Sequence, residues 1–288
     1  MTTLSHIPAE QRPKRMSREE MDALTSPDIP LYIAALLAGP ANVIMQLANV
    51  PVGRGVVESK VESGNLLLHP IKRTRTTLTY LAVAAAGTPE DRKSFREAVN
   101  SAHRQVHSTH DSPVKYNAMD PKLQLWVAAC LYRGWEDMAR LYGRPGDVNE
   151  KAYRQAVTMG TTLQMPYEMW PATRADFQEY WDGVVAQIEM DPEVRAYLTK
   201  LTKLGFLGKG PQYVLGWYAQ ALTLGYLPPE FRDMMRMHPS PAQRTFFDFH
   251  NVVIRTATRI TPRPIQEIPF RLLLADVRRR RRKGQPLV

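Results

Sequence analysis

Histidines are the first residues whose spacing suggests chemistry, because three of the seven in the chain lie within residues 103–110. On a helix that begins at Pro89, His103 follows Val99 by one turn and falls on the apolar face. A buried histidine most often donates a hydrogen bond to a backbone carbonyl. Neutral imidazole is also the commonest nitrogen ligand of metal ions and binds haem iron. Both interpretations of His103 remain open at this point.

A three-histidine metal site is another use of the same cluster. His107 lies four residues after His103, and two histidines at that spacing share one face of a helix. The third ligand would have to be His110, which lies beyond the predicted end of the helix. Because no glutamate directly follows His103, the pattern departs from the known two-histidine zinc motif.

A second candidate group lies in residues 69–81, where Arg73 and Thr77 are four residues apart and share a helix face. From composition alone, a solvated basic first turn explains this segment. An arginine at the edge of a core would also bind a carboxylate such as a haem propionate, and a threonine hydroxyl can donate to an oxygen ligand. The segment therefore supplies a candidate anion clamp.

Helices must position these residues, since apolar side chains recur at intervals of three and four while alternation with period two is scarce. Capping signals such as Ser17 with Glu20 and Thr173 with Asp176 mark the helix starts. Only residues 65–69 suggest a strand. The pattern predicts an all-α fold with helices near residues 17–25, 30–48, 71–86, 89–107, 121–142, 149–162, 174–189, 192–203, 211–223 and 241–259.

The stretch from Ile29 to Gly53 has no charged residue and is long enough to cross a bilayer. The Gly39-Pro40 pair interrupts it, Pro51 ends it, and polar residues lie inside it, so we expect a kinked core helix. The first 20 residues lack the apolar core of a signal peptide and do not resemble a transit peptide. We therefore expect a cytoplasmic protein.

Composition supports a single large helical domain. Of the 288 residues 44% are hydrophobic and 23% charged, which excludes an intrinsically disordered chain. A single cysteine, Cys130, excludes an internal disulfide framework and any zinc or iron–sulfur site built on cysteines. We expect a mobile N-terminal segment at residues 1–16, a helical domain at 17–277 and a basic tail at 278–288.

The basic tail carries +6 of the net charge of +10, in the run RRRRRK at residues 278–283. Such a block is typical of a solvated tail, and it would also be attracted to nucleic acid or to anionic membrane surfaces. No motif for sequence-specific nucleic-acid binding occurs. No G-x-G-x-x-G phosphate loop occurs either.

Five segments of the chain carry a resemblance to a known family. They are AGPANVIMQLANVPVGRGVVES (38–59), HPIKRTRTTLTYLAVAAAGTPED (69–91), AHRQVHS (102–108), YNAMDPKLQLWVAA (116–129) and MPYEMWPATRADFQEYW (165–181). In order and spacing the chain resembles the haem-dependent oxygenases that include the latex-clearing rubber oxygenases and the oxygenase of mycophenolic acid biosynthesis. The resemblance covers roughly residues 30 to 200.

The resemblance implies roles for four residues. His103 occupies the position of the histidine in the family's H-x-x-V pattern, which in rubber oxygenases is the proximal ligand of haem b iron. Arg73 and Thr77 match residues implicated in activity or haem retention. Glu58 corresponds to a catalytic base only by its place upstream of Arg73.

The sequence also departs from the family. Asn49, Ser59 and Ala128 stand where members commonly have histidine, and Thr76 stands where latex-clearing enzymes have a lysine. These changes leave the proximal ligand in place, but a latex-clearing reaction does not follow from them. An altered substrate, or a haem protein without turnover, therefore stays open.

Taken together, the sequence predicts an all-α, single-domain bundle that encloses a haem pocket. The resemblance implies a haem b-dependent oxygenase that uses dioxygen on an apolar, isoprenoid-like substrate, with iron bound by His103 and with Arg73, Thr77 and Glu58 in the site. The alternatives are a non-haem metalloprotein that uses His103, His107 and His110, and a non-catalytic binding module with a basic tail. The substrate and the oligomeric state cannot be read from the sequence.

Overall fold

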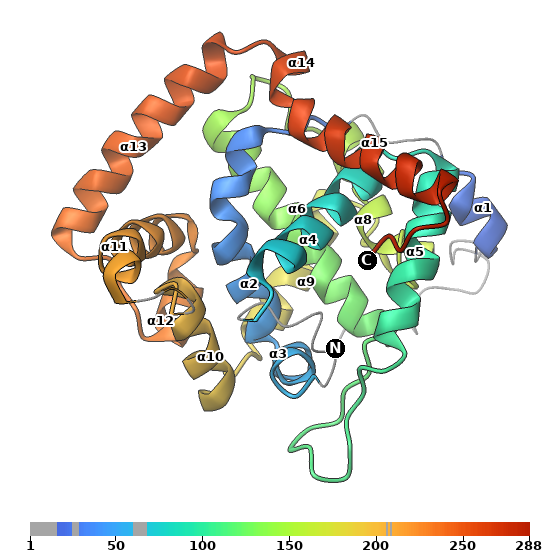
Figure 1. The fold of residues 1–288 in the computed structure, drawn as a ribbon, viewed down its shortest axis with the longest axis horizontal. Helices are drawn as coiled ribbons and strands as arrows, with labels where there is room; N and C mark the ends of the chain where they lie inside the picture. The colour runs from blue at the N-terminus through green and yellow to red at the C-terminus, as the bar shows by residue number, and fades with distance from the viewer. Residues whose placement is uncertain (1–15, 25–28, 60–67, 206, 208) are drawn as a thin grey trace.

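A computed structural model describes residues 16–24, 29–59, 68–205, 207 and 209–288. It is all-α and forms one domain (Figure 1). The described residues contain no named strand and only an isolated bridge between His107 and Asn117. The helices are α1 (Arg18–Asp22), η3 (Ile33–Ala38), α2 (Gly39–Ala48), α3 (Val50–Val57), α4 (Pro70–Ala86), α5 (Pro89–His103), α6 (Pro121–Tyr142), α7 (Glu150–Gln155), α8 (Thr158–Thr161), η5 (Tyr167–Met169), α9 (Arg174–Val185), α10 (Pro192–Thr202), α11 (Lys209–Tyr226), α12 (Pro229–Met235), α13 (Pro241–Ile260), α14 (Arg263–Gln266) and α15 (Ile268–Arg282).

Side-chain caps begin many of these helices, as the sequence predicts. Ser17, Thr88, Thr173 and Ser240 each accept a hydrogen bond from the backbone N–H of the third helical residue, whose side chain in turn accepts one from the backbone N–H of the cap residue. Asp120 and Asp191 cap α6 and α10 directly. Proline at the first helical position follows four of these caps, where its missing N–H costs no hydrogen bond.

Helix α6 runs through the middle of the molecule and packs against α2, α8, α13 and η3 (Figure 1). Its 22 residues are buried over most of their length. Aromatic rings pack against one another on one side of it, with Tyr132 on α6 contacting Tyr153, Trp170 and Phe177. This cluster contributes to a rigid core against which the neighbouring helices are held.

The uncharged stretch folds as two helices joined at a sharp bend. Helices α2 and α3 meet at Asn49, whose backbone is extended, and the segments 33–48 and 50–57 make an angle of 109°. Gly39 and Pro40 begin α2, and Pro51 lies in the first turn of α3. The residues predicted to interrupt and to end one kinked core helix therefore begin two separate helices. No single described helix has the length and apolar character to cross a membrane, although this bent pair together meets both criteria.

Helix α15 lies across α4 and α5 (Figure 1). It continues through Arg282, so the predicted boundary of a tail at residue 278 is wrong for residues 278–282. Arg278 and Arg281 bind the carboxylate of Asp91, which is completely buried at the start of α5. Arg280 binds Asp276 on its own helix. Much of the basic run therefore belongs to the packed structure, because buried and neighbouring carboxylates attract it.

Two sequence-based expectations fall largely outside the described residues. The N-terminal segment 1–16, predicted to be mobile, is described only at Met16, and residues 65–67 of the candidate strand are not described. Of that candidate strand, Leu68 and His69 form a turn and a bend before α4.

Candidate functional site

A cavity of about 1090 Å³ lies among α2, α4, α6, α10 and the segment that joins α11 to α12. Its wall is mainly apolar, and these elements together supply leucine, methionine and aromatic side chains to it. Ligand pockets commonly have volumes of roughly 300–1,000 Å³. The cavity is thus large enough for a sizeable organic group.

Arg73 and Thr77 both line this cavity, because they lie one turn apart on α4. The Thr77 hydroxyl donates to the carbonyl of Arg73 at 3.1 Å and keeps its lone pairs available. Burial lowers the pKa of Arg73, while the nearby Tyr197 opposes that shift. Among the described residues no carboxylate pairs with the guanidinium of Arg73, so the cavity contains a cation that an anionic group would neutralise.

His103 is the last residue of α5, because the chain leaves the helix at Arg104 rather than at the predicted residue 107. Burial, followed by the positive charge of Arg73, lowers the pKa of His103 to about 4. The imidazole is therefore neutral near pH 7. Its Nδ1 atom is buried and has no hydrogen-bond partner. His103 is not itself among the lining residues of the cavity, but it lies close enough to Arg73 for the charge of that arginine to lower its pKa.

Glu58 lies at the end of α3 and is not part of the cavity wall. One carboxylate oxygen accepts hydrogen bonds from Ser112 Oγ at 2.6 Å and from the Tyr116 hydroxyl at 3.0 Å. The other oxygen lies 3.5 Å from Arg54. These contacts fix the loop after α5 to α3, so the structure gives Glu58 a connecting role beside the predicted site.

The other two histidines lie in the loop that follows α5. His107 is exposed, and His110 is fully exposed beside Asp111. No group of three histidine, cysteine or acidic residues in the described ranges could hold a metal ion. His103, His107 and His110 therefore do not form the alternative metal site, because α5 ends before the second of them.

The positions that depart from the family lie apart from this cavity wall. Asn49 occupies the bend between α2 and α3, and its Oδ1 atom is buried without a hydrogen-bond partner. Ala128 is buried in α6. The Thr76 hydroxyl donates to the Lys72 carbonyl and is not among the lining residues.

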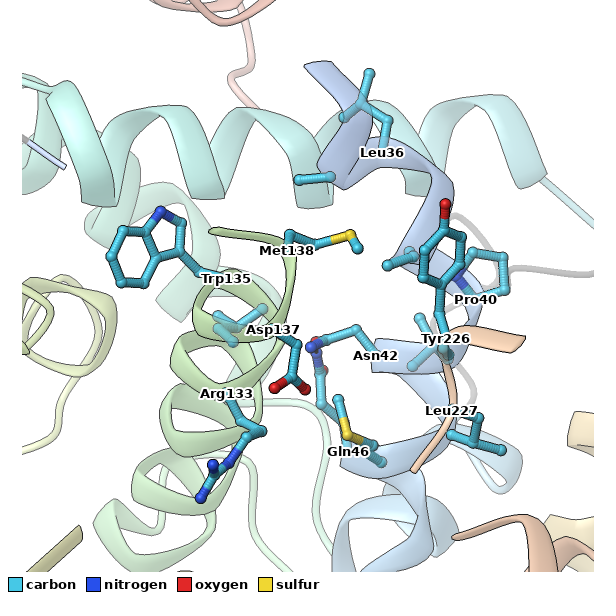
Figure 2. Close-up of a pocket in the computed structure, with 18 of the residues that line it drawn as sticks. Leu36, Pro40, Asn42, Gln46, Arg133, Trp135, Asp137, Met138, Tyr226 and Leu227 are labelled. Carbon is cyan, nitrogen blue, oxygen red and sulfur yellow. Dashed lines mark hydrogen bonds between the residues drawn. The ribbon is translucent and has the colours of Figure 1, made fainter. Parts of the chain in front are cut away.

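Sequence reasoning missed a polar part of the cavity wall, which Figure 2 shows between α2 and α6. Asn42 and Gln46 come from α2, and Arg133 and Asp137 come from α6. The spacing of Arg133 and Asp137 places them on one face of α6. Charged residues at this spacing in a helix that is buried over most of its length were the signal that could have revealed this group.

The fold and cavity define an all-α protein with a large, mainly apolar cavity, and comparison with known proteins places it in a family. The sequence model of the catalytic domain of the ER-bound oxygenase mpaB/B′ and rubber oxygenase family matches residues 31–258. The chain therefore belongs to this family of oxygenase catalytic domains.

Two mycobacterial relatives resemble most of the chain. Uncharacterized proteins from Mycobacterium tuberculosis and Mycobacterium bovis are each 48% identical over 255 residues, which cover 88% of this chain and 100% of the relative. No solved structure matches. The aligned segment of the relatives is longer than the segment matched by the family model, but the names of the relatives state no activity.

Proposed function

We propose that this protein binds haem b and acts as an oxygenase that uses dioxygen on an apolar small molecule, with isoprenoids as the first candidates. Membership of the oxygenase family supports the reaction class. The mainly apolar wall of the cavity supports an apolar substrate.

The observation that carries the proposal is that His103 and Arg73 lie close together. His103 is a partly buried, neutral imidazole whose buried Nδ1 atom has no hydrogen-bond partner. A buried polar atom without a partner is unusual and calls for an explanation such as an absent ligand. Arg73 supplies a nearby cation without a carboxylate partner, at the edge of a large cavity. A nitrogen ligand for iron and a cation for a propionate are what haem requires from a protein.

When bound, haem would supply the redox chemistry with dioxygen. His103 would hold the iron, and Arg73 would bind a propionate. Thr77, whose hydroxyl already donates to the Arg73 carbonyl, would accept a hydrogen bond from a polar group in the cavity. The apolar side chains of the wall would exclude water and hold the body of the substrate.

Absorption spectroscopy of the purified full-length chain tests the proposal. We expect a Soret band and a pyridine haemochrome of the b type. His103→Ala should lose haem or change its axial ligation, while the matched variant His107→Ala keeps the spectrum because His107 is exposed. An unchanged spectrum for His103→Ala, equal loss in both variants, or zinc in place of iron would overturn the assignment.

The roles of α4 can be tested with neighbours on the same helix. Arg73→Ala should lower haem occupancy, whereas Arg75→Ala removes a surface ion pair with Asp276 and should leave occupancy unchanged. Thr77→Val should slow turnover more than Thr76→Val, because only Thr77 lines the cavity. If Arg73→Ala and Thr77→Val both behave like their controls, α4 has no part in the site.

A further inference from the structure

The polar part of the cavity wall, made of Asn42, Gln46, Arg133 and Asp137, is not explained by the proposed haem site. Figure 2 shows Asp137 extending from α6 toward α2, where Asn42 and Gln46 lie. These residues line the same cavity as Arg73 and Thr77. A ligand that fills the cavity would therefore meet apolar side chains along its body and this polar group at one place.

The amides of α2 are held in a defined orientation. Asn42 Nδ2 donates to the Cys130 carbonyl at 2.6 Å, and Gln46 Nε2 donates to Asn42 Oδ1 at 2.7 Å. Residue 134 is glycine, and a Cβ atom there would lie 2.3 Å from Asn42 Nδ2. The absence of that side chain lets Asn42 reach the backbone of α6. With its Nε2 bonded to Asn42, the Gln46 side chain offers its Oε1 atom as a hydrogen-bond acceptor.

Asp137 is the second acceptor at this place. Its carboxylate has no hydrogen bond or ion pair with the described residues, and burial raises its pKa to about 6. The neighbouring Arg133 is used elsewhere: it donates to Gln178 Oε1 at 2.6 Å and to Glu136 at 3.3 Å. Its guanidinium also lies over the ring of Trp181 at 5.0 Å. Asp137 therefore faces the cavity as a partly buried carboxylate without a donor.

An unpaired carboxylate beside an apolar cavity is costly, so a hydrogen-bond donor on the ligand would stabilise it. The charges around Asp137 decide which donor fits. Arg133 and Arg140 on α6 favour its ionised form, while Glu136 and Glu230 oppose it. These two arginines and two glutamates nearly offset one another, and the rest of the wall is mainly apolar. A neutral donor such as a hydroxyl therefore fits better than an ammonium group, because it costs less to remove from water.

We propose that Asp137 accepts a hydrogen bond from the hydroxyl group of an apolar alcohol, whose hydrocarbon body lies along the remaining wall of the cavity. The alcohol would be the substrate of the proposed oxygenase, so this inference rests on the proposed function. Pockets commonly use a few placed polar groups to orient a mainly apolar ligand. Asp137 would thereby select alcohols from hydrocarbons of the same size.

Calorimetric titration of the full-length protein with 1-decanol and with its methyl ether tests this inference. The two probes share a hydrocarbon chain, but only the alcohol can donate a hydrogen bond. We expect the wild type to bind 1-decanol at least tenfold more tightly than the ether, which corresponds to about 1.4 kcal/mol. Asp137→Leu should abolish this preference, and Asp137→Asn should reduce it while conserving side-chain volume.

Asp182→Leu is the matched control. Asp182 also lines the cavity, but its carboxylate already accepts a hydrogen bond from Gln178 Nε2 at 2.7 Å. This variant should keep the preference for the alcohol. Equal binding of the two probes by the wild type, or a preference that survives in both Asp137 variants, would overturn the inference. A haem spectrum of the same preparation separates the outcomes, since loss of the preference in a haem-loaded protein leaves the proposed function standing.

Discussion

Removal of residues 278–288 should destabilise the protein, because it takes two cations from a buried carboxylate. Asp91 is 0% exposed, and Arg278 donates to its Oδ2 from two nitrogens at 3.0 and 2.8 Å. Arg281 donates to the other oxygen at 3.2 Å. Breaking a buried ion pair by removing one partner costs about 3–5 kcal/mol. Since the Arg278 side chain is 41% exposed, we expect a loss near the lower limit, about 3 kcal/mol.

Equilibrium unfolding in urea, followed by circular dichroism, measures this loss. A shorter deletion of residues 283–288 is the control, because it removes Leu287 and Val288 but keeps Arg278 and Arg281. Asp91→Asn, which leaves both arginines without their carboxylate, should lose a similar amount. If the two deletions unfold at the same urea concentration, residues 278–282 do not belong to the packed structure and the argument fails.

The same ion pair predicts a pH dependence of stability. Burial alone would raise the pKa of Asp91, but hydrogen bonds from Arg278 and from the Thr88 backbone outweigh it and lower the pKa below the ordinary value of 3.8. The unfolded chain therefore binds the proton more readily, so the stabilisation is complete above about pH 4 and is lost as the pH falls through the lower value in the folded state. The stability gap between wild type and Asp91→Asn should narrow below pH 4, and a gap independent of pH would contradict this.

Two further predictions concern α6. Gly134→Ala should lower the free energy of unfolding by about 1–3 kcal/mol, because its Cβ would lie 2.3 Å from Asn42 Nδ2; an unchanged urea midpoint would contradict this. Glu136→Gln should cost about 3 kcal/mol in the same assay, since this buried carboxylate binds Arg133, Arg140 and Arg174. A loss no larger than that of the exposed control Glu150→Gln would show that the network contributes little.

The positions of most helices could be predicted because their starts carry local signals. Ser17, Thr88, Thr173 and Ser240 cap their helices through side chains, which is visible in the sequence. Helices α12, α14 and α15 have no side-chain cap and were missed. The end of α5 was placed too late, because the loop beyond it is held by long-range backbone bonds such as Ala118 N to Val106 O.

The candidate site could be predicted only in part. The inward position of His103 on α5 follows from helical periodicity, but its closeness to Arg73 depends on the packing of α4 against α5. The resemblance to the oxygenase family, rather than spacing, suggested that the two act together. Asp137 was missed because the orientation of α6 toward α2 decides whether it faces the cavity, and no local pattern encodes that orientation.

Helix α15 also affects when the site can be completed during synthesis. It joins α4 through Arg75 and Asp276, and α5 through Asp91 with Arg278 and Arg281. At the usual ~5–20 residues per second, a ribosome makes α15 roughly 10–40 seconds after α5. During that interval α4 and α5, which carry Arg73 and His103, lack their contacts with α15, and Asp91 has no cation from that helix. Full assembly of the site must therefore wait until α15 has emerged.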